Sequence, residues 1–269
     1  MQNDRTAVAR QVASRAPLPA GMRACAGLIA ILVGFSAMII TNAPTALAAG
    51  NISGMTVVLD PGHNGIVDPS ISRQVNNGRG GTKACNTSGT ATNDGYTEHA
   101  FTWDVALHVR DALDRLGVRT TMTRDSDNGV GPCVDQRAAL ANAAKPDAII
   151  SIHADGGPPS GRGFHVNYSS PPLTDIQGAP TLQLATTMRD ALIASGLPES
   201  NYIGGQGLYG RADLAGLNLA QYPAVLVELG NMKNTDDAAQ MESSDGRAKY
   251  AAAVTEGLTN YLSGRAPSH

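Results

Sequence analysis

Short strand-like runs alternate with helix-like patterns along most of the chain. Strands are predicted over residues 55–60, 118–123, 148–152, 163–168 and 224–227. Between and after them, apolar residues recur at helical spacing over residues 98–116, 134–144, 182–195, 235–241 and 245–262. Strands that alternate with helices are typical of an α/β domain. We therefore predict a single domain with a twisted, mostly parallel mixed sheet of about six strands flanked by helices.

One long segment, residues 64–96, follows neither period and is rich in Gly, Asn, Ser and Thr. Irregular segments of this length inside a compact domain are usually functional loops or lids. The segment carries Arg73, Arg79 and Lys83, which we expect to be solvated rather than bound to a substrate. No internal repeat and no Pro- or Ser-rich linker interrupts the rest of the chain, so the sequence favours one domain.

The first 48 residues have the pattern of a secretory signal peptide. Four arginines precede an apolar run over residues 24–40, and the small residues Ala46 and Ala48 follow it. Cleavage after Ala48 would leave a domain over residues 49–269 that is secreted or periplasmic. The alternative is a permanent membrane anchor. The run is at the lower edge of spanning length and no basic stop-transfer residues follow it, so we expect no stable anchor after cleavage.

Removal of the signal segment changes both the charge and the cysteine count. The whole chain has 20 Lys+Arg and 23 Asp+Glu, and the net charge of −3 becomes about −6 once four arginines and one aspartate are lost. An acidic chain is not expected to bind nucleic acid by bulk charge. Cys25 is removed, and the remaining Cys85 and Cys133 predict a disulfide in an oxidising compartment, the alternative being two free thiols. Closure of that loop contributes about 4 kcal/mol.

Residues able to bind a metal or move a proton lie where several predicted elements begin or end. Asp60 and His63 close the first strand, His153 the third and Glu228 the last, and Glu98 opens the first helix. The carboxyl ends of parallel strands meet at one crevice. Two His and one Glu are common zinc ligands, and a further carboxylate can accept a proton from a zinc-bound water. From the residues alone, hydrogen-bonded structural histidines and a helix-dipole Glu remain alternatives.

Five motifs follow one another in the chain: Val57-Val-Leu-Asp-Pro-Gly-His63, Glu98, Arg137 with Ala141-Asn142, Ser151-Ile-His-Ala154, and Val225-Leu-Val-Glu228. From about residue 55 to 262, this ordered set resembles zinc-dependent N-acetylmuramoyl-L-alanine amidases of the Amidase_3 type. The resemblance implies one zinc ion per chain, held by His63, Glu98 and His153, with Glu228 as the catalytic carboxylate. It also implies zinc-assisted hydrolysis of the amide between the lactyl group of N-acetylmuramic acid and L-Ala of the stem peptide.

The chain departs from the pattern of that family at three places. His99 follows Glu98 where the family usually has Lys, which makes His99 a rival ligand. Adjacent helical residues point about 100° apart, so both cannot easily bind one ion, and we expect Glu98 to be the ligand. Asn231 follows Gly230 where the family usually has Phe, and the segment 64–96 is longer than the family link.

Three further residues are candidates for contacts to the substrate or to the ligands. Asp60 could accept a hydrogen bond from a ligand imidazole, because such histidines usually have a second partner, or it could simply be a turn residue before Pro-Gly. His165 on the fourth predicted strand and Arg211 in a Gly-rich segment could face the same crevice.

Two other functions remain open at this point. The chain could be a different exported zinc amidohydrolase or peptidase that cuts within the stem peptide, or a catalytically inactive cell-wall-binding module. A binding module needs no base beside a metal, so the presence of Glu228 together with the three ligands argues against the second alternative. We expect a monomer that acts on peptidoglycan or muropeptides and does not bind nucleic acid.

Overall fold

The computed structural model describes residues 51–265, so the predicted signal segment lies outside the described residues. The strands are β1 Thr56–Pro61, β2 Gln74–Asn76, β3 Thr82–Ala84, β4 Arg119–Met122, β5 Ala148–Asp155, β6 His165–Ser169, β7 Leu208–Arg211 and β8 Ala224–Asn231. The helices are α1 Glu98–Arg115, α2 Val134–Ala143, α3 Ala179–Ala194, α4 Ala215–Asn218, α5 Thr235–Glu242 and α6 Ser244–Ser263. Within residues 51–265, no helix has the length and apolar character needed to cross a membrane.

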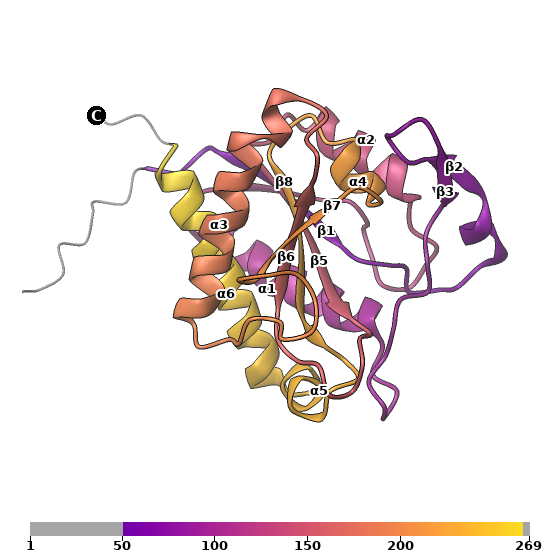
Figure 1. Cartoon of the computed structure of the whole chain (residues 1–269). Helices are drawn as coiled ribbons and strands as arrows, with labels where there is room; N and C mark the ends of the chain where they lie inside the picture. The colour runs from indigo at the N-terminus through magenta and orange to yellow at the C-terminus, as the bar shows by residue number, and fades with distance from the viewer. Residues whose placement is uncertain (1–50, 266–269) are drawn as a thin grey trace, which may run out of the picture. The chain divides into compact units, whose positions relative to one another are not determined.

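Six strands form one mixed sheet in the order β4-β1-β5-β8-β6-β7 (Figure 1). Strands β4, β1, β5 and β8 are parallel to one another. Strand β6 runs antiparallel to β8, and β7 pairs parallel with β6. The predicted α/β class, the mixed sheet and the strand number are therefore confirmed.

The main core lies between one face of the sheet and helices α1, α3 and α6. Alternate residues of the central strands point to this face, including Val57, Leu59, Ile150, Ile152 and Val227. Helices α3 and α6 run side by side over it (Figure 1). The opposite face carries a smaller apolar cluster against α2 and α4, formed by Val58, Ala141, Ile149, Leu217, Ala220, Ala224 and Leu226. Because helices cover this second face only in part, it has room for a site.

Helix α1 shows how closely the sequence pattern follows the core. Its apolar residues Phe101, Val105, Val109 and Leu113 recur at helical spacing and are fully buried. Gly117 follows the helix with a φ of +76°, a conformation that glycine adopts without strain, as expected for the residue after a helix end. Thr97 occupies the N-cap position at the other end, but its side chain accepts no hydrogen bond from the first turn.

The segment 64–96 contains a hairpin that the sequence pattern did not reveal. Strands β2 and β3 pair antiparallel within it, and Val75 is the apolar residue that they bury. Cys85 and Cys133 form a disulfide, as predicted, with their sulfurs 2.12 Å apart. Cys133 directly precedes α2, so the disulfide joins the hairpin to the start of that helix.

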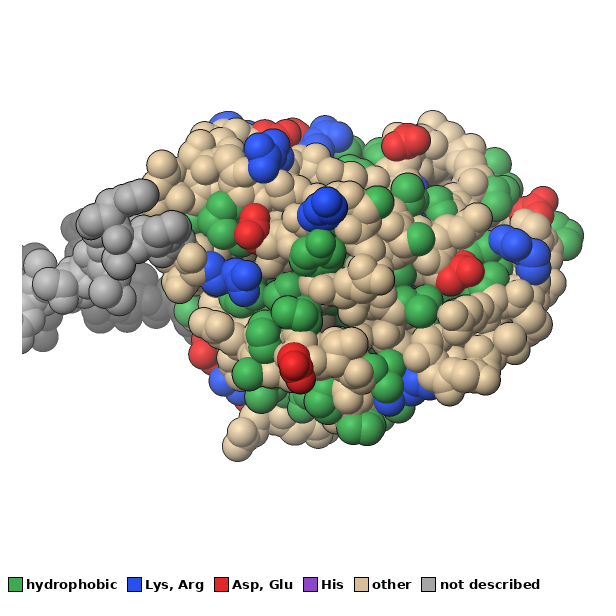
Figure 2. Space-filling view, turned by 90° about the horizontal axis from the view of Figure 1, so that it is seen from above, with side chains coloured by type: hydrophobic (Ala, Val, Ile, Leu, Met, Phe, Trp, Pro, Cys, Tyr) green, Lys and Arg blue, Asp and Glu red, His purple; other side chains and the backbone are tan. Residues whose placement is uncertain are grey.

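On the face seen in Figure 2, Lys and Arg side chains are interspersed with Asp and Glu.

Candidate metal centre

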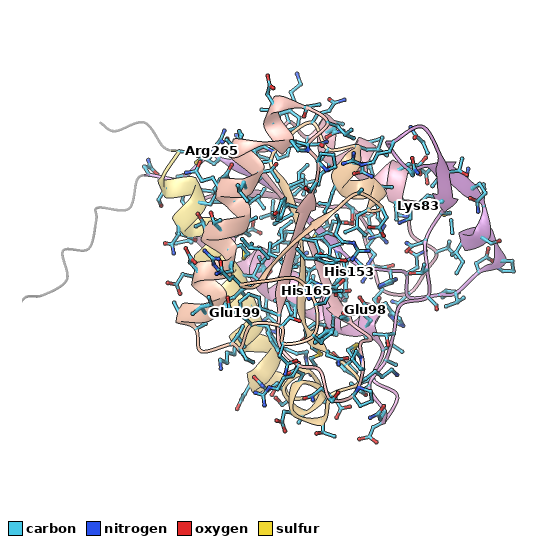
Figure 3. All side chains as sticks on the ribbon, viewed as in Figure 1. Lys83, Glu98, His153, His165, Glu199 and Arg265 are labelled. Atoms are coloured by element: carbon cyan, nitrogen blue, oxygen red, sulfur yellow. A yellow bond between two sulfur atoms is a disulfide. The ribbon has the colours of Figure 1, made fainter. Side chains whose placement is uncertain are left out.

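Strand alternation places a row of polar residues on the partly covered face of the sheet. His153 in β5 lies directly opposite Glu228 in β8, and Glu228 lies directly opposite His165 in β6. Residues in register on neighbouring strands share a face, so the three side chains line up across the sheet. Figure 3 shows His153 next to Glu98, which begins α1. The sequence predicts that these residues meet at one edge of the sheet. In the structure they lie on one face of the sheet near that edge.

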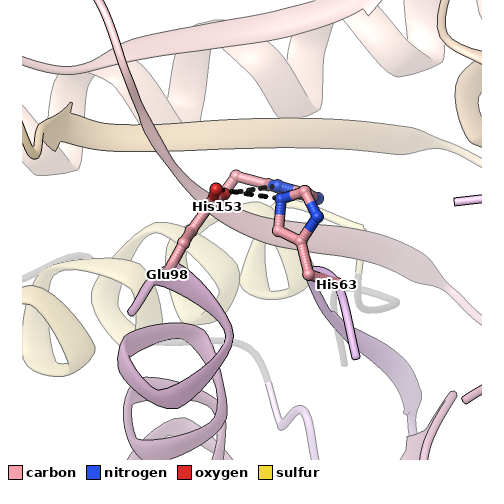
Figure 4. A group of neighbouring side chains, drawn as sticks. All are labelled: His63, Glu98 and His153. Carbon is pink, nitrogen blue, oxygen red and sulfur yellow. Dashed lines mark hydrogen bonds and ion pairs between the residues drawn. The ribbon is translucent and has the colours of Figure 1, made fainter. Parts of the chain in front are cut away.

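Three of the predicted ligands converge in space (Figure 4). The Nε2 atom of His63 lies 2.9 Å from Oε2 of Glu98, and Nδ1 of His153 lies 2.9 Å from Oε1 of the same carboxylate. One donor atom from each residue lies within 4.8 Å of the other two. Two imidazole nitrogens and a carboxylate oxygen are the donor set typical of catalytic zinc.

The contacts of His63 leave its Nε2 atom facing the Glu98 carboxylate. Its Nδ1 lies 2.9 Å from the carbonyl oxygen of Thr87, which can only accept, so Nδ1 carries the proton. In a neutral imidazole, Nε2 then points a lone pair at the Glu98 carboxylate. A proton or a metal ion must lie between them to make the contact favourable. The residues therefore fit a bound metal, and the Thr87 carbonyl is the second partner that a ligand histidine usually has.

The same contacts shift the pKa values of the ligands when no metal is bound. Burial alone would raise the pKa of Glu98, but hydrogen bonds from His153 and His63 outweigh it, and the pKa is lowered. For His63, burial would lower the pKa, yet the hydrogen bond to Glu98 and its charge raise it. The buried carboxylate is therefore held ionised and ready to bind a cation.

Neighbouring glycines leave room for the ligand side chains. A Cβ atom at Gly62 would lie 2.4 Å from Cε1 of His153, and one at Gly89 would lie 2.9 Å from Oε2 of Glu98. His63 itself has a φ of +62°, a left-handed conformation that is strained for a residue with a side chain. The Arg137 guanidinium donates to the His63 carbonyl and holds this conformation. The side chains of the predicted ligands are thus fixed by backbone and side-chain packing.

Glu228 lies next to the ligand cluster and lines the same cavity. Its Oε2 atom is enclosed and has no hydrogen-bond partner among the described residues. Burial raises the pKa of Glu228 well above its usual value, with further contributions from the negative charges of Glu98 and Asp155. A carboxyl group of raised proton affinity beside a metal cluster is suited to accept and return a proton.

The cavity has a volume of about 440 Å³ and reaches from the ligands to α4. Its polar wall includes Lys83 of the hairpin and Arg211 of β7. The Arg211 guanidinium pairs with Asp213 at 2.6 Å and lies 5.1 Å from the centre of the Tyr209 ring. Its apolar wall is formed by small and aliphatic side chains, among them Ala138, Ala141, Ile149, Leu214, Leu217 and Leu226.

Asp60 and His99, which were also considered from the sequence, contact groups other than the three predicted ligands. Asp60 accepts hydrogen bonds from Thr123, Ser151 and Arg137. The His63 imidazole has the Thr87 carbonyl as its second partner, in place of Asp60. Burial opposes these contacts, but together they lower the pKa of Asp60 to about 2. His99 bonds Asp127 at 2.9 Å and lies outside the ligand cluster.

Some contacts around the site could not be read from the sequence. Arg79 donates to Ser169 and to the Pro171 carbonyl, and Lys83 donates to the carbonyl of Asp213 at 2.9 Å. The expectation that both side chains are simply solvated was therefore wrong, because they tie the hairpin to the β7–α4 region. Tyr202 is a further unexpected neighbour, and its hydroxyl donates to Asp155 at 2.8 Å. No local pattern marks either group, since the partners are far apart in the chain.

A family model, a related sequence and two crystal structures all match this chain to amidases of one kind. The Amidase_3 family, described as N-acetylmuramoyl-L-alanine amidase, matches residues 57–260. N-acetylmuramoyl-L-alanine amidase Rv3717 of Mycobacterium tuberculosis is 60% identical over 235 residues, which is 87% of this chain and 97% of that protein. The crystal structure of the amidase Ami1 from Mycobacterium smegmatis is 63% identical and superposes with a TM-score of 0.80, covering 80% of this chain and 100% of that one. For apo Ami1 from Mycobacterium abscessus the identity is 63%, the TM-score 0.78 and the coverage 78% and 99%.

Proposed function

The chain belongs to the Amidase_3 family of N-acetylmuramoyl-L-alanine amidases, and from this premise we propose how its residues perform the hydrolysis. The scissile amide joins the lactyl group of N-acetylmuramic acid to L-Ala of the stem peptide. The observation that carries the assignment of the site is the convergence of His63, Glu98 and His153 beside Glu228 in one cavity. A peptidase cutting elsewhere in the stem peptide could use the same residues, so the bond cleaved is the point to test.

We assign His63, Glu98 and His153 as the ligands of one zinc ion. A zinc ion in such a site polarises the substrate carbonyl and lowers the pKa of a bound water towards about 7. The two nitrogen donors and one oxygen donor suit zinc, and the Thr87 carbonyl orients the His63 ring for this role. The convergence of one donor atom from each residue within 4.8 Å of the other two supports this assignment independently of the family.

Glu228 is the residue that we assign to proton transfer. Its carboxylate takes a proton from the attacking water and then delivers that proton to the leaving nitrogen of L-Ala. The role requires a group with high proton affinity that is close to the ligands, and the raised pKa and the cavity position of Glu228 supply both. In the same cavity, Arg211 contributes a positive charge and lowers the proton affinity of Glu228 in part.

The cavity walls suggest how the substrate is held. Arg211 and Lys83 both line the cavity and both contact Asp213, so they lie close together, and each can pair with a carboxylate of the stem peptide. The small side chains of α2 that line the cavity, Ala138 and Ala141, leave space for the methyl groups of the lactyl group and of L-Ala. Recognition is then local, in agreement with the interspersed positive and negative side chains on the face seen in Figure 2.

We propose that the enzyme works outside the cytoplasm on peptidoglycan or its fragments. The predicted signal peptide over residues 1–48 and the catalytic domain over 49–269 are consistent with export. The Cys85–Cys133 disulfide also fits an oxidising compartment, since such bonds are rare where thiols are kept reduced. The protein is expected to act as a monomer.

Product analysis tests the bond that is cleaved. Purified protein is incubated with N-acetylmuramoyl-L-alanyl-D-isoglutamine, and the products are identified by mass spectrometry. Release of N-acetylmuramic acid together with a peptide that begins with free L-Ala supports the proposal. Products that keep L-Ala attached to muramic acid would show that the enzyme is a peptidase instead. The Glu228→Gln variant, which keeps the shape of the side chain, provides the matched control.

A further inference from the structure

Five buried side-chain atoms lack hydrogen-bond partners within residues 51–265, and two of them belong to residues directly opposite each other on neighbouring strands. These two atoms are Nδ1 of His165 and Oε2 of Glu228. His165 is only 1% exposed, so bulk water does not reach its ring nitrogens to hydrogen-bond with them. Buried polar groups are almost always paired, and an unpaired one calls for an explanation. Here one group can donate a hydrogen bond and the other can accept one.

The strand register brings these two side chains together. His165 and Glu228 are directly opposite each other in the antiparallel pair of β6 and β8. The Cβ atoms of such a pair lie about 4.5–5.5 Å apart and their side chains leave the same face of the sheet. An imidazole nitrogen can therefore reach the carboxylate by a side-chain rotation without any movement of the backbone.

The other neighbours of His165 leave its hydrogen-bond donor free. The Tyr202 and Tyr209 rings contact it edge-on, with centroids 6.3 and 6.1 Å away. The Tyr202 hydroxyl already donates to Asp155. Among charged groups, Asp155 and Arg211 act on His165 in opposite directions, and burial, the largest effect, lowers its pKa to about 4. At neutral pH the ring is uncharged and has one N–H to donate.

We propose that His165 is a positioning residue for Glu228, donating an imidazole N–H to its carboxylate during turnover. The donated hydrogen bond fixes which carboxylate oxygen faces the reacting water and which faces the sheet. His165 itself does not touch the substrate or the metal. This inference rests on the proposed role of Glu228 and adds a residue to it.

Two substitutions separate hydrogen bonding from packing. His165→Leu fills a similar volume without a donor, whereas His165→Asn keeps an N–H near the position of Nδ1. We expect His165→Leu to lower kcat by about 10- to 100-fold, the loss typical when a supporting hydrogen bond in a catalytic site is removed. KM, zinc content and Tm should remain close to those of the wild type. His165→Asn should recover most of the lost kcat.

Asn167→Leu is the matched control. Asn167 is a buried polar residue two positions further along the same face of β6, and it lies opposite Leu226 rather than Glu228. Its substitution should leave kcat almost unchanged. If His165→Leu fails to fold, His165→Phe keeps a flat ring between the two tyrosines and tests the same point.

Several outcomes would overturn the proposal. Wild-type kcat in His165→Leu or His165→Phe would show that no donor is needed. Equal loss in the Leu and Asn variants would assign the effect to packing. A wild-type protein that does not cleave the amide would instead contradict the proposed function, so the two failures are distinguishable.

Discussion

A single methyl group at position 62 should weaken metal binding. A Cβ atom in Gly62→Ala would lie 2.4, 2.6 and 2.7 Å from Cε1, Nδ1 and Nε2 of the His153 ring. Non-bonded carbon atoms pack at about 3.5–4.0 Å, so the ring must retreat by about 1 Å. The backbone cannot yield instead, because the Gly62 N–H donates to the Ile152 carbonyl at 2.9 Å and its own carbonyl accepts from Thr102.

The expected size of the effect follows from this displacement. A ligand moved by about 1 Å loses a large part of its coordination, and we expect zinc affinity to fall by about 10- to 100-fold. Competition with a chromogenic chelator measures the affinity, and amidase assays at limiting zinc should follow the same trend. Gly129→Ala is the control, since its Cβ would meet no atom within 4 Å. Unchanged zinc affinity in Gly62→Ala would refute the assignment of His153 as a ligand.

Three further predictions follow from the same structure. In metal-free protein, Asp60→Asn should lower the free energy of unfolding by about 2 kcal/mol at neutral pH, because the folded-state pKa is about 2 against an ordinary value of 3.8. This contribution is complete above about pH 4 and is lost as the pH falls through 2. Urea denaturation at pH 3 should therefore show about half of the stability difference between wild type and Asp60→Asn that is measured at pH 7. An equal stability difference at pH 3 and pH 7 would contradict the reasoning. The double variant Cys85→Ser, Cys133→Ser should lose about 4 kcal/mol of stability in the same assay, and a loss below about 1 kcal/mol would mean that the unfolded chain is already constrained. Arg211→Met should raise KM for an anionic muropeptide with a smaller change in kcat, and a steady-state assay in which KM does not move would remove Arg211 from the substrate site.

Much of the fold could be predicted because its elements carry strong periodic signals. The apolar positions of α1 and the short apolar runs of β1 and β5 specify buried elements whatever their partners. The hairpin β2–β3 buries chiefly Val75 and is otherwise polar, so no period marks it. Strand β7 and helix α4 were missed for a related reason, since each has four residues, too few to establish a pattern.

The candidate site shows the same division. Residues at strand ends could be picked out because polar side chains interrupt apolar runs, which placed His63, His153 and Glu228 together. His165 lies opposite Glu228 because β6 pairs antiparallel with β8. The order of strands in the sheet cannot be predicted from the pattern of residues, so this pairing was not predicted. The contact of Thr87 with His63 comes from backbone geometry in a loop, for which side-chain patterns carry no information.

The most direct test of the central claim combines zinc content with bond cleavage. Metal-free protein is titrated with zinc while the cleavage of N-acetylmuramoyl-L-alanyl peptides is followed by mass spectrometry. Activity should rise with zinc and saturate at one ion per chain. Glu228→Gln should bind the same single ion with little or no turnover. Full activity without zinc, or wild-type turnover in Glu228→Gln, would contradict the central claim.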